Sequence, residues 1–258
     1  MPKKNSLLDG TCTSPQWRKA RPKLCVLPVG AFEQHSTHLP LATDNIQVEY
    51  FAQFIARELS AALLPTLPYG TSLEHSGFPG TFTLRPETLI QFVRDIADAA
   101  ERQGFTTMIL LNGHGGNFAL GPVVRDINRM DRKLKILLVT WYDSQDEKLL
   151  ESKAQGKPNI HAEEAETSVM LALRGDLVKP GRPAYKPTVK GFLQTDLATF
   201  GVGFIVPNGA YGDASLASRE KGEKLILSIQ RNIVKHIRQR LQWLGKSRIY
   251  CGKGRVQG

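Results

Sequence analysis

The chain has 258 residues, enough for one α/β domain with a deep pocket, and its 22% of charged residues is ordinary for a soluble globular protein. The formal charge of +10 could attract an anion, but a merely basic surface is the commoner explanation, and without a nucleic-acid-binding motif we expect no nucleic-acid partner. Three widely spaced cysteines exclude a disulfide framework, and no run approaches the roughly 20 apolar residues of a membrane helix. We therefore expect a cytoplasmic protein that makes no membrane contact.

Short apolar runs alternate with longer amphipathic segments along the chain. The apolar runs, which predict buried strands, cover residues 24–29, 63–69, 107–111 and 135–141. The amphipathic segments, which predict helices, cover residues 45–64, 86–103, 118–130, 163–173 and 216–244. The remaining stretches predict loop, partly helical over residues 143–160 and with short strands over residues 179–213.

This alternation of strands and helices indicates βαβ units around a parallel sheet. We predict a single-domain α/β fold with three α/β/α layers and a mostly parallel central sheet, over residues 23–244. Residues 1–22 would form an N-terminal extension and residues 245–258 a basic C-terminal tail. In such folds ligands bind at the carboxyl ends of the strands, so the residues that follow each strand are the first candidates for a site.

Two carboxylates and an imidazole follow the first apolar run. Glu33 and His35 are two residues apart, and in extended chain such residues point to the same side. Asp44 returns after a loop that contains Pro40. Carboxylates and imidazoles without thiolates suit Zn²⁺, Mn²⁺ or Fe²⁺, and the two oxygens of an Asp can bridge two ions. We therefore predict that Glu33, His35 and Asp44 bind metal.

His114 lies just beyond the buried run 107–111, inside the segment NGHGGN. Glycines on both sides let the backbone turn sharply and bring the imidazole into a crowded site, although a lone His beside Gly is more often a turn or core residue. We predict His114 as the fourth metal ligand. A strand, a glycine loop and a helix can also bind a phosphate through backbone amides, so a non-catalytic phosphate- or nucleotide-binding module remains an alternative.

A third cluster of histidine and acidic residues spans His161 to Glu166. Glu163 and Glu164 fit the start of a helix, where negative charge is favourable. Glu166 lies five residues after His161, which is not a same-face spacing on a helix. The two side chains can therefore converge only if His161 precedes the helix.

These three clusters together resemble the creatininase (creatinine amidohydrolase) family. The segments EQHSTHLPLATD, NGHGGN and HAEEAETS stand in the order of that family's motifs, and the resemblance covers roughly residues 23–240. It implies a single-domain creatininase-like α/β fold with a centre of two divalent metal ions (Zn, Mn or Fe), often in a homohexamer. Because three separate motifs agree, the resemblance is specific.

The resemblance also implies a role for each candidate residue. Glu33 and His114 would help hold one ion, His35 would hold the other, and Asp44 would bridge both. His161 would be a catalytic proton shuttle or substrate contact, and Glu166 a further metal ligand or catalytic acid–base group. In creatininase proper a Glu follows two residues after the NGH histidine, whereas this chain has Gly116. Either Glu166 or water would fill that ligand position.

We predict a metal-dependent amidohydrolase that cleaves a C–N amide bond, of the cyclic amide or formamide type, in a small molecule. Water activated by two metal ions would attack the amide carbonyl. The alternatives are a peptide-trimming peptidase of the same family and the phosphate- or nucleotide-binding module. Residues that could line the pocket, without a ranking, are Tyr69, Glu74, His75, Phe78, Arg85, Trp141 and Tyr211.

Overall fold

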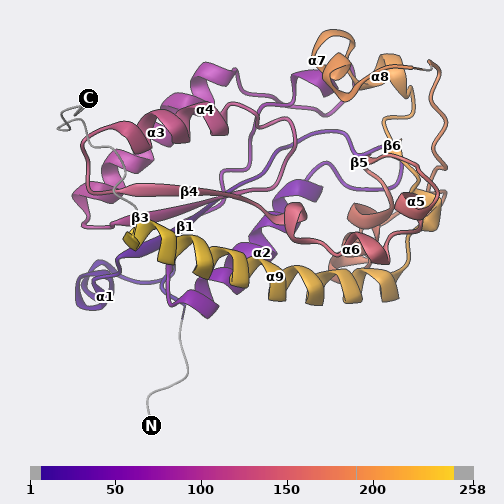
Figure 1. Ribbon diagram of the computed structural model, residues 1–258. Helices are drawn as coiled ribbons and strands as arrows, with labels where there is room; N and C mark the ends of the chain where they lie inside the picture. Colours follow the sequence, from indigo (N-terminus) through magenta and orange to yellow (C-terminus); the bar gives the residue numbers. More distant parts are fainter. Residues whose placement is uncertain (1–6, 190, 247–258) are drawn as a thin grey trace, which may run out of the picture.

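The computed structural model describes residues 7–189 and 191–246. Within these residues four parallel strands form the central sheet, in the order β2–β1–β3–β4. The strands are β1 (Leu24–Val29), β2 (Ala62–Leu63), β3 (Thr107–Asn112) and β4 (Lys135–Thr140). One face is covered by α3 (Pro86–Arg102) and α4 (Leu120–Arg129), and the other by α2 (Thr43–Leu59) and α9 (Arg219–Lys246) (Figure 1). The predicted three-layer fold with a parallel sheet is confirmed.

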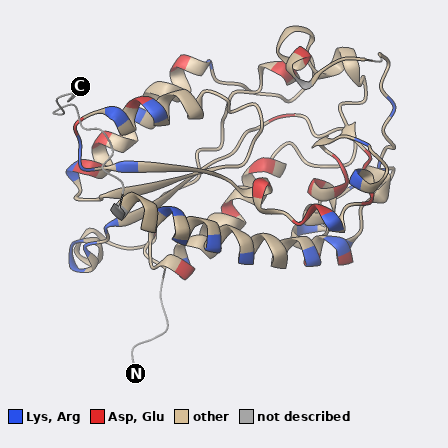
Figure 2. Ribbon diagram, viewed as in Figure 1, with Lys and Arg blue, Asp and Glu red and all other residues tan. Residues whose placement is uncertain are grey.

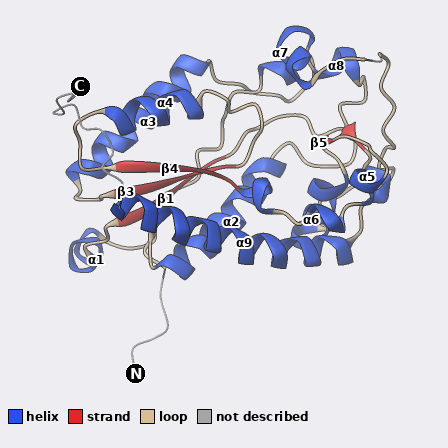
Figure 3. Cartoon of the chain, in the orientation of Figure 1, coloured by secondary structure: helices blue, strands red, loops and turns tan. Residues whose placement is uncertain are grey.

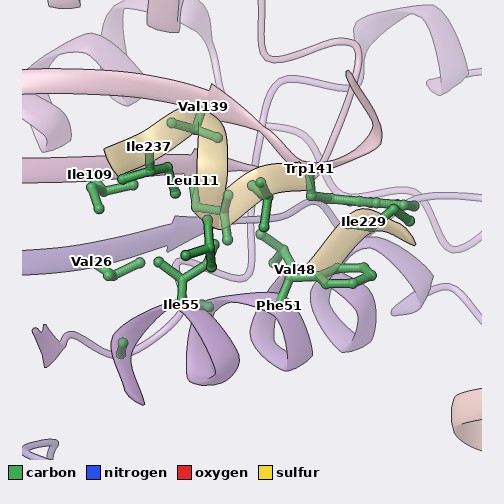
Figure 4. Close-up of a cluster of buried hydrophobic side chains, with 14 of the residues drawn as sticks. Val26, Val48, Phe51, Ile55, Ile109, Leu111, Val139, Trp141, Ile229 and Ile237 are labelled. Atoms are coloured by element: carbon green, nitrogen blue, oxygen red, sulfur yellow. The ribbon is translucent and has the colours of Figure 1, made fainter. Parts of the chain in front are cut away.

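Strand β3 shows how the sequence builds the two cores. Successive side chains of a strand point to opposite faces of the sheet. Ile109 and Leu111 therefore pack into the core between the sheet, α2 and α9, where Phe51 stacks on Trp141 with ring centroids 5.0 Å apart (Figure 4). Met108 and Leu110 enter the opposite core, under α3 and α4. Because both faces are buried, the strand reads as one continuous apolar run.

The edge strand β2 differs from the prediction. The helix expected over residues 45–64 ends at Leu59, because Ser60 adopts a left-handed conformation with φ of 52° and turns the chain. The strand expected over residues 63–69 shortens to Ala62–Leu63, with one further bridge from Leu67 to Val29. Pro65 and Pro68 have no N–H to donate to a neighbouring strand, which explains why the ladder stops.

The chain after β4 is irregular, and Figure 3 shows long loops where the sheet ends. It holds two short helical turns, Trp141–Ser144 and Glu147–Leu149, before α5 (Glu151–Ala154) and β5 (Asn159–His161). Next come α6 (Glu164–Arg174), α7 (Leu197–Phe200), α8 (Val202–Ile205) and β6 (Tyr211–Gly212), which pairs antiparallel with β5. The expectation of short strands over residues 179–213 is therefore wrong apart from β6, since the middle of this stretch folds into two four-residue helices.

The segment expected as an N-terminal extension lies against the sheet over its described residues, from residue 7. Leu8 forms a parallel bridge with Ala62, and Trp17 of α1 (Ser14–Ala20) packs edge-on against Phe105. Residues 247–258, most of the expected basic tail, lie outside the described residues, and α9 runs to Lys246. No helix in the described part of the chain is long and apolar enough to cross a membrane.

Candidate metal centre

The predicted site residues converge at the carboxyl end of the parallel sheet, as expected for this fold. Glu33 and His35 follow β1, Asp44 is in the first turn of α2, His114 follows β3, His161 ends β5, and Glu166 is in the first turn of α6. The side chains of Glu33, His35 and Asp44 are completely or almost completely buried. The Lys and Arg residues, by contrast, are spread over outer helices such as α9 (Figure 2). The sheet thus gathers a buried cluster of carboxylates and imidazoles inside a basic protein.

Asp44 stands between two imidazoles. Its Oδ1 lies 3.4 Å from His35 Nε2, and its Oδ2 lies 3.3 Å from His114 Nδ1. A second carboxylate lies beside each imidazole. Glu166 Oε1 is 3.5 Å from His35 Nε2, and Glu33 Oε2 is 3.1 Å from His114 Nε2. One carboxylate facing two nitrogen–oxygen sets is the arrangement of a bridging ligand between two ions.

Among the described residues, three overlapping sets could each hold an ion, with ligand atoms within 4.8 Å of one another. The sets are Glu33–Asp44–His114, His35–Asp44–Glu166 and Glu33–His35–His161. Several of these atoms are buried without a hydrogen-bond partner in the described structure, namely Glu33 Oε1 and Oε2, His35 Nε2 and Asp44 Oδ2. Buried charged acceptors are stable only when paired or bound to a cation. The nitrogen–oxygen donor set fits Zn²⁺, Mn²⁺ or Fe²⁺.

Hydrogen bonds from the far side of each imidazole set its orientation. His35 Nδ1–H donates to the Glu33 carbonyl at 3.1 Å, which leaves Nε2 facing Asp44 and Glu166. His114 Nε2–H donates to the Thr71 carbonyl at 3.1 Å, which leaves the lone pair of Nδ1 facing Asp44. Both protons are assigned from these partners. Metal-binding histidines usually donate their other N–H to a carbonyl or carboxylate in this way.

Gln34 and His75 also join the site. The Gln34 side-chain amide donates to His75 Nδ1 at 2.8 Å and to the Gly209 carbonyl at 3.2 Å. With Nδ1 accepting, His75 carries its proton on Nε2, 3.4 Å from Glu33 Oε1. The sequence named His75 only as an unranked pocket residue and did not single out Gln34. The one available signal was Gln34's place between two predicted ligands.

The backbone of Gln34 orients His161 as well. His161 Nε2–H donates to the Gln34 carbonyl at 2.8 Å, so its Nδ1 lone pair faces Glu33 Oε1 at 3.6 Å. Gln34 Nε2 also lies 3.1 Å from His161 Nε2, but both amide hydrogens are already directed to His75 and Gly209. That pair of nitrogens is therefore a close contact between two donors rather than a hydrogen bond.

Burial and neighbouring charge divide the site into neutral and charged groups. Burial raises the pKa of Glu33 to about 8 and lowers the pKa of His161 to about 3. For Glu166, burial opposes ionisation, but the adjacent His35 lowers its pKa to about 2. For His35, burial favours the neutral form, yet Glu166 and Asp44 hold its pKa well above the usual range. Protonated His35 therefore balances carboxylate charge that a divalent ion would otherwise balance.

The start of α6 brings Glu166 to the site. Ala162, with a φ of 50°, turns the chain between β5 and the helix, so His161 precedes the helix as convergence required. Glu163 caps α6 by accepting from the amides of Ala165 and Glu166, as a helix-start residue should. Glu166 Oε2 accepts from the Ala162 amide at 2.7 Å, which leaves Oε1 for the ion set with His35.

Gly116 cannot supply a ligand, and its surroundings leave no room for a side chain. A Cβ at Gly116 would lie 2.1 Å from Glu74 Oε1 and 2.3 Å from His114 Nε2. Of the two alternatives for the missing ligand, water or Glu166, the structure brings the carboxylate of Glu166 to the second ion set.

Two cavities flank the site and share His114 and His161. The larger, of about 380 Å³, is lined by Asp44, Glu166, Trp141, Tyr142 and Lys153 among others. The smaller, of about 190 Å³, is lined by Glu74, His75, Gly116, Phe118 and Tyr211 among others. Of the unranked pocket residues, Phe78 lines an outer groove that adjoins the smaller cavity and shares Glu74 and Phe118 with it. Neither Tyr69 nor Arg85 lines either cavity.

Comparisons with known proteins find several enzymes that are similar to this chain. The Pseudomonas putida creatinine amidohydrolase is 31% identical over 83% of this chain and 88% of its own length. The 3-dehydro-scyllo-inosose hydrolase of Thermotoga maritima is 29% identical over 84% of this chain and 78% of its own length. The mycofactocin precursor peptide peptidase of Mycobacterium ulcerans is 28% identical over 88% of this chain and 89% of its own length.

Solved creatininases have the same fold. A manganese form superposes with a TM-score of 0.76 at 25% identity, covering 91% of this chain and 99% of the other. A zinc–zinc form of a creatininase variant superposes with a TM-score of 0.72 at 26% identity, covering 92% and 99%. The model of the creatininase (creatinine amidohydrolase) family matches residues 10–237. With its fold, its buried ligand cluster and this match over most of its length, the chain belongs to the creatininase family.

Proposed function

We propose that this protein is a metal-dependent amidohydrolase that cleaves a C–N amide bond, of the cyclic amide or formamide type, in a small molecule. The observation that carries the proposal is the buried Asp44 carboxylate, which faces His35 on one side and His114 on the other. Glu33, His114 and Asp44 would hold one ion, and His35, Glu166 and Asp44 the other. Two divalent ions held there would supply a nucleophilic water near neutral pH and would polarise the amide carbonyl.

His161 is the residue placed to move the proton. Its Nε2–H donates to the Gln34 carbonyl, so the unprotonated Nδ1 faces Glu33 within the proposed metal centre. An imidazole whose pKa is lowered by burial is neutral near pH 7 and can accept a proton from the attacking water. It then passes that proton to the leaving nitrogen. Glu166, with one oxygen held by the Ala162 amide, is assigned to metal binding rather than to proton transfer.

The test begins with metal content. Purified protein should carry about two equivalents of Zn, Mn or Fe per chain, and should hydrolyse at least one member of a panel of creatinine, formamides, lactams and short peptides. His114→Ala and Asp44→Ala should abolish metal content and activity together. His236→Ala, which changes a histidine of α9 that lies outside the cluster, is the matched control and should retain both.

The panel also separates the alternatives. Cleavage of peptides alone would favour a peptide-trimming peptidase, which several relatives' names support. The relatives' names span creatinine, 3-dehydro-scyllo-inosose and a precursor peptide, so family membership leaves the substrate open. A protein without metal that binds a nucleotide tightly would overturn the hydrolase in favour of the binding module.

We further propose a cytoplasmic homo-oligomer, a hexamer by resemblance to the family. An outer groove supports self-association, because its wall exposes Phe118, Phe200 and Phe204 by 61%, 55% and 55%. The free thiols of Cys12 and Cys25 are compatible with a reducing compartment. Light scattering of the purified protein measures the oligomeric state directly, and a monomer at micromolar concentration would contradict the hexamer.

A further inference from the structure

The smaller of the two cavities has a single charged residue in its wall. Its lining includes the imidazoles of His75, His114 and His161 and the apolar side chains of Leu197 and Val202. Among the described residues that line it, Glu74 is the one Asp, Glu, Lys or Arg. It comes from the helical turn Leu73–His75, outside the predicted motifs.

Glu74 is mostly buried, yet it lacks a hydrogen-bond donor. Its side chain is 15% exposed, and within the described residues no N–H or O–H donates to its carboxylate. The one basic side chain near it is His114, whose Nε2 is 3.7 Å from Oε1 and already donates to the Thr71 carbonyl. Buried carboxylates are normally paired, so the partner of Glu74 is expected to arrive with a ligand.

Gly116 makes this position of Glu74 possible. Any side chain at residue 116 would begin 2.1 Å from Glu74 Oε1, in the space that the carboxylate fills. The glycine therefore does more than leave a ligand position empty: it admits a different carboxylate, which reaches the cavity from another segment. Glu74 also belongs to none of the three ion sets in the described structure. A bound substrate therefore remains as the candidate partner of Glu74.

We propose that Glu74 binds a positively charged nitrogen of the substrate, such as an ammonium group close to the scissile amide. This inference rests on the proposed function, because the amide carbonyl must lie at the two ions. Glu74 is 3.7 Å from the proposed ligand His114, so only a few bonds can separate the charged nitrogen from the carbonyl. Carboxylate–ammonium hydrogen bonds are among the strongest in proteins.

Two hydroxamates of equal shape test the proposal by binding rather than by turnover. Glycine hydroxamate carries an ammonium group where propionohydroxamate carries a methyl group, and the hydroxamate of each binds metal ions. Calorimetry with metal-loaded protein should show glycine hydroxamate binding roughly tenfold or more tightly. Glu74→Gln should abolish the preference, while propionohydroxamate binds as before. Glu87→Gln removes an exposed carboxylate of α3 and should leave the preference intact.

The outcomes separate this inference from the proposed function. Equal binding of the two hydroxamates by the unaltered protein, or a preference that survives Glu74→Gln, would overturn the role of Glu74 and leave the metal centre standing. Failure of the unaltered protein to retain metal or to bind propionohydroxamate would overturn the proposed function itself. Metal content of the Glu74→Gln variant, measured first, shows whether Glu74 holds an ion, and a loss there would also overturn the substrate role.

Discussion

The two halves of the site are built differently. Glu33, His35 and His114 follow regular strands of a parallel sheet, where buried ladders on both sides fix the backbone. Glu74 and the walls of the smaller cavity come from short turns and helices between the regular elements. The difference indicates a division of labour. Residues at the carboxyl end of the sheet, together with Asp44 of α2 and Glu166 of α6, would hold the ions, and the irregular segments would select what reaches them. Loops on a rigid scaffold commonly have this role.

We expect the largest loss of activity from a substitution at Gly116, where His114 and Glu74 come together. In Gly116→Ala the added methyl group would overlap Glu74 Oε1 and His114 Nε2, so at least one of them must move. A displacement of about 1 Å in a catalytic site costs about a hundredfold in rate, and we expect a loss of that order in kcat/KM. Gly121→Ala is the matched control, since nothing lies within 4 Å of its Cβ. Full activity of Gly116→Ala would mean that the two halves are not in contact in solution.

A second, smaller effect, on metal affinity, tests whether His75 from an irregular segment also supports the metal centre. His75 Nε2–H faces Glu33, and Gln34 holds its other nitrogen. His75→Phe keeps a ring but removes both contacts, and we expect metal affinity to fall roughly 10–100-fold in chelator competition. His75→Gln, which can again present an N–H, should recover part of that loss. An unchanged metal affinity in His75→Phe would mean that His75 does not support the metal centre.

The smallest effect concerns the anchoring of α6 and should spare activity. Glu164 is fully buried, pairs with Lys221 of α9 and accepts from the amides of Glu151 and Ser152 at 3.0 and 2.7 Å. Burial opposes its ionisation, but Lys221 and these amides lower its pKa below the ordinary value of 4.5. We expect Glu164→Gln to cost roughly 1–3 kcal/mol of unfolding free energy at pH 7.

The pH dependence of that cost follows from the direction of the shift. A carboxyl group with a lowered folded pKa contributes its stability above its unfolded pKa and loses it as the pH falls through the folded value. Urea unfolding should therefore show a difference in unfolding free energy between the unaltered protein and Glu164→Gln at pH 7. That difference should shrink below about pH 4.5. A difference in unfolding free energy that stays constant down to pH 3 would mean that the substitution acts through packing rather than through charge.

The contrast between regular strands and irregular segments also explains which parts of the fold and of the site the sequence predicts. Strand β3 can be predicted from its continuous apolar run, because both of its faces are buried. The proposed ligands after β1 and β3 are then predicted because they directly follow a strand. The sequence says nothing comparable about Glu74, because a three-residue turn has no periodicity and the partner that explains it, Gly116, is 42 positions away. Lys221 is likewise matched to Glu164 only by the packing of α9 on α6.

The register of the sheet has a consequence for any attempt to redesign the centre. Val29 and Asn112 are paired neighbours at the ends of β1 and β3, so the chains that carry Glu33 and His114 leave the sheet one strand spacing apart, about 4.8 Å. That interval is set by backbone hydrogen bonds shared with the whole core, and it separates two proposed ligands of the same ion. Exchanging one ligand for another can change which metal binds. Changing the interval between these two ligands requires a longer or shorter chain between Val29 and Glu33.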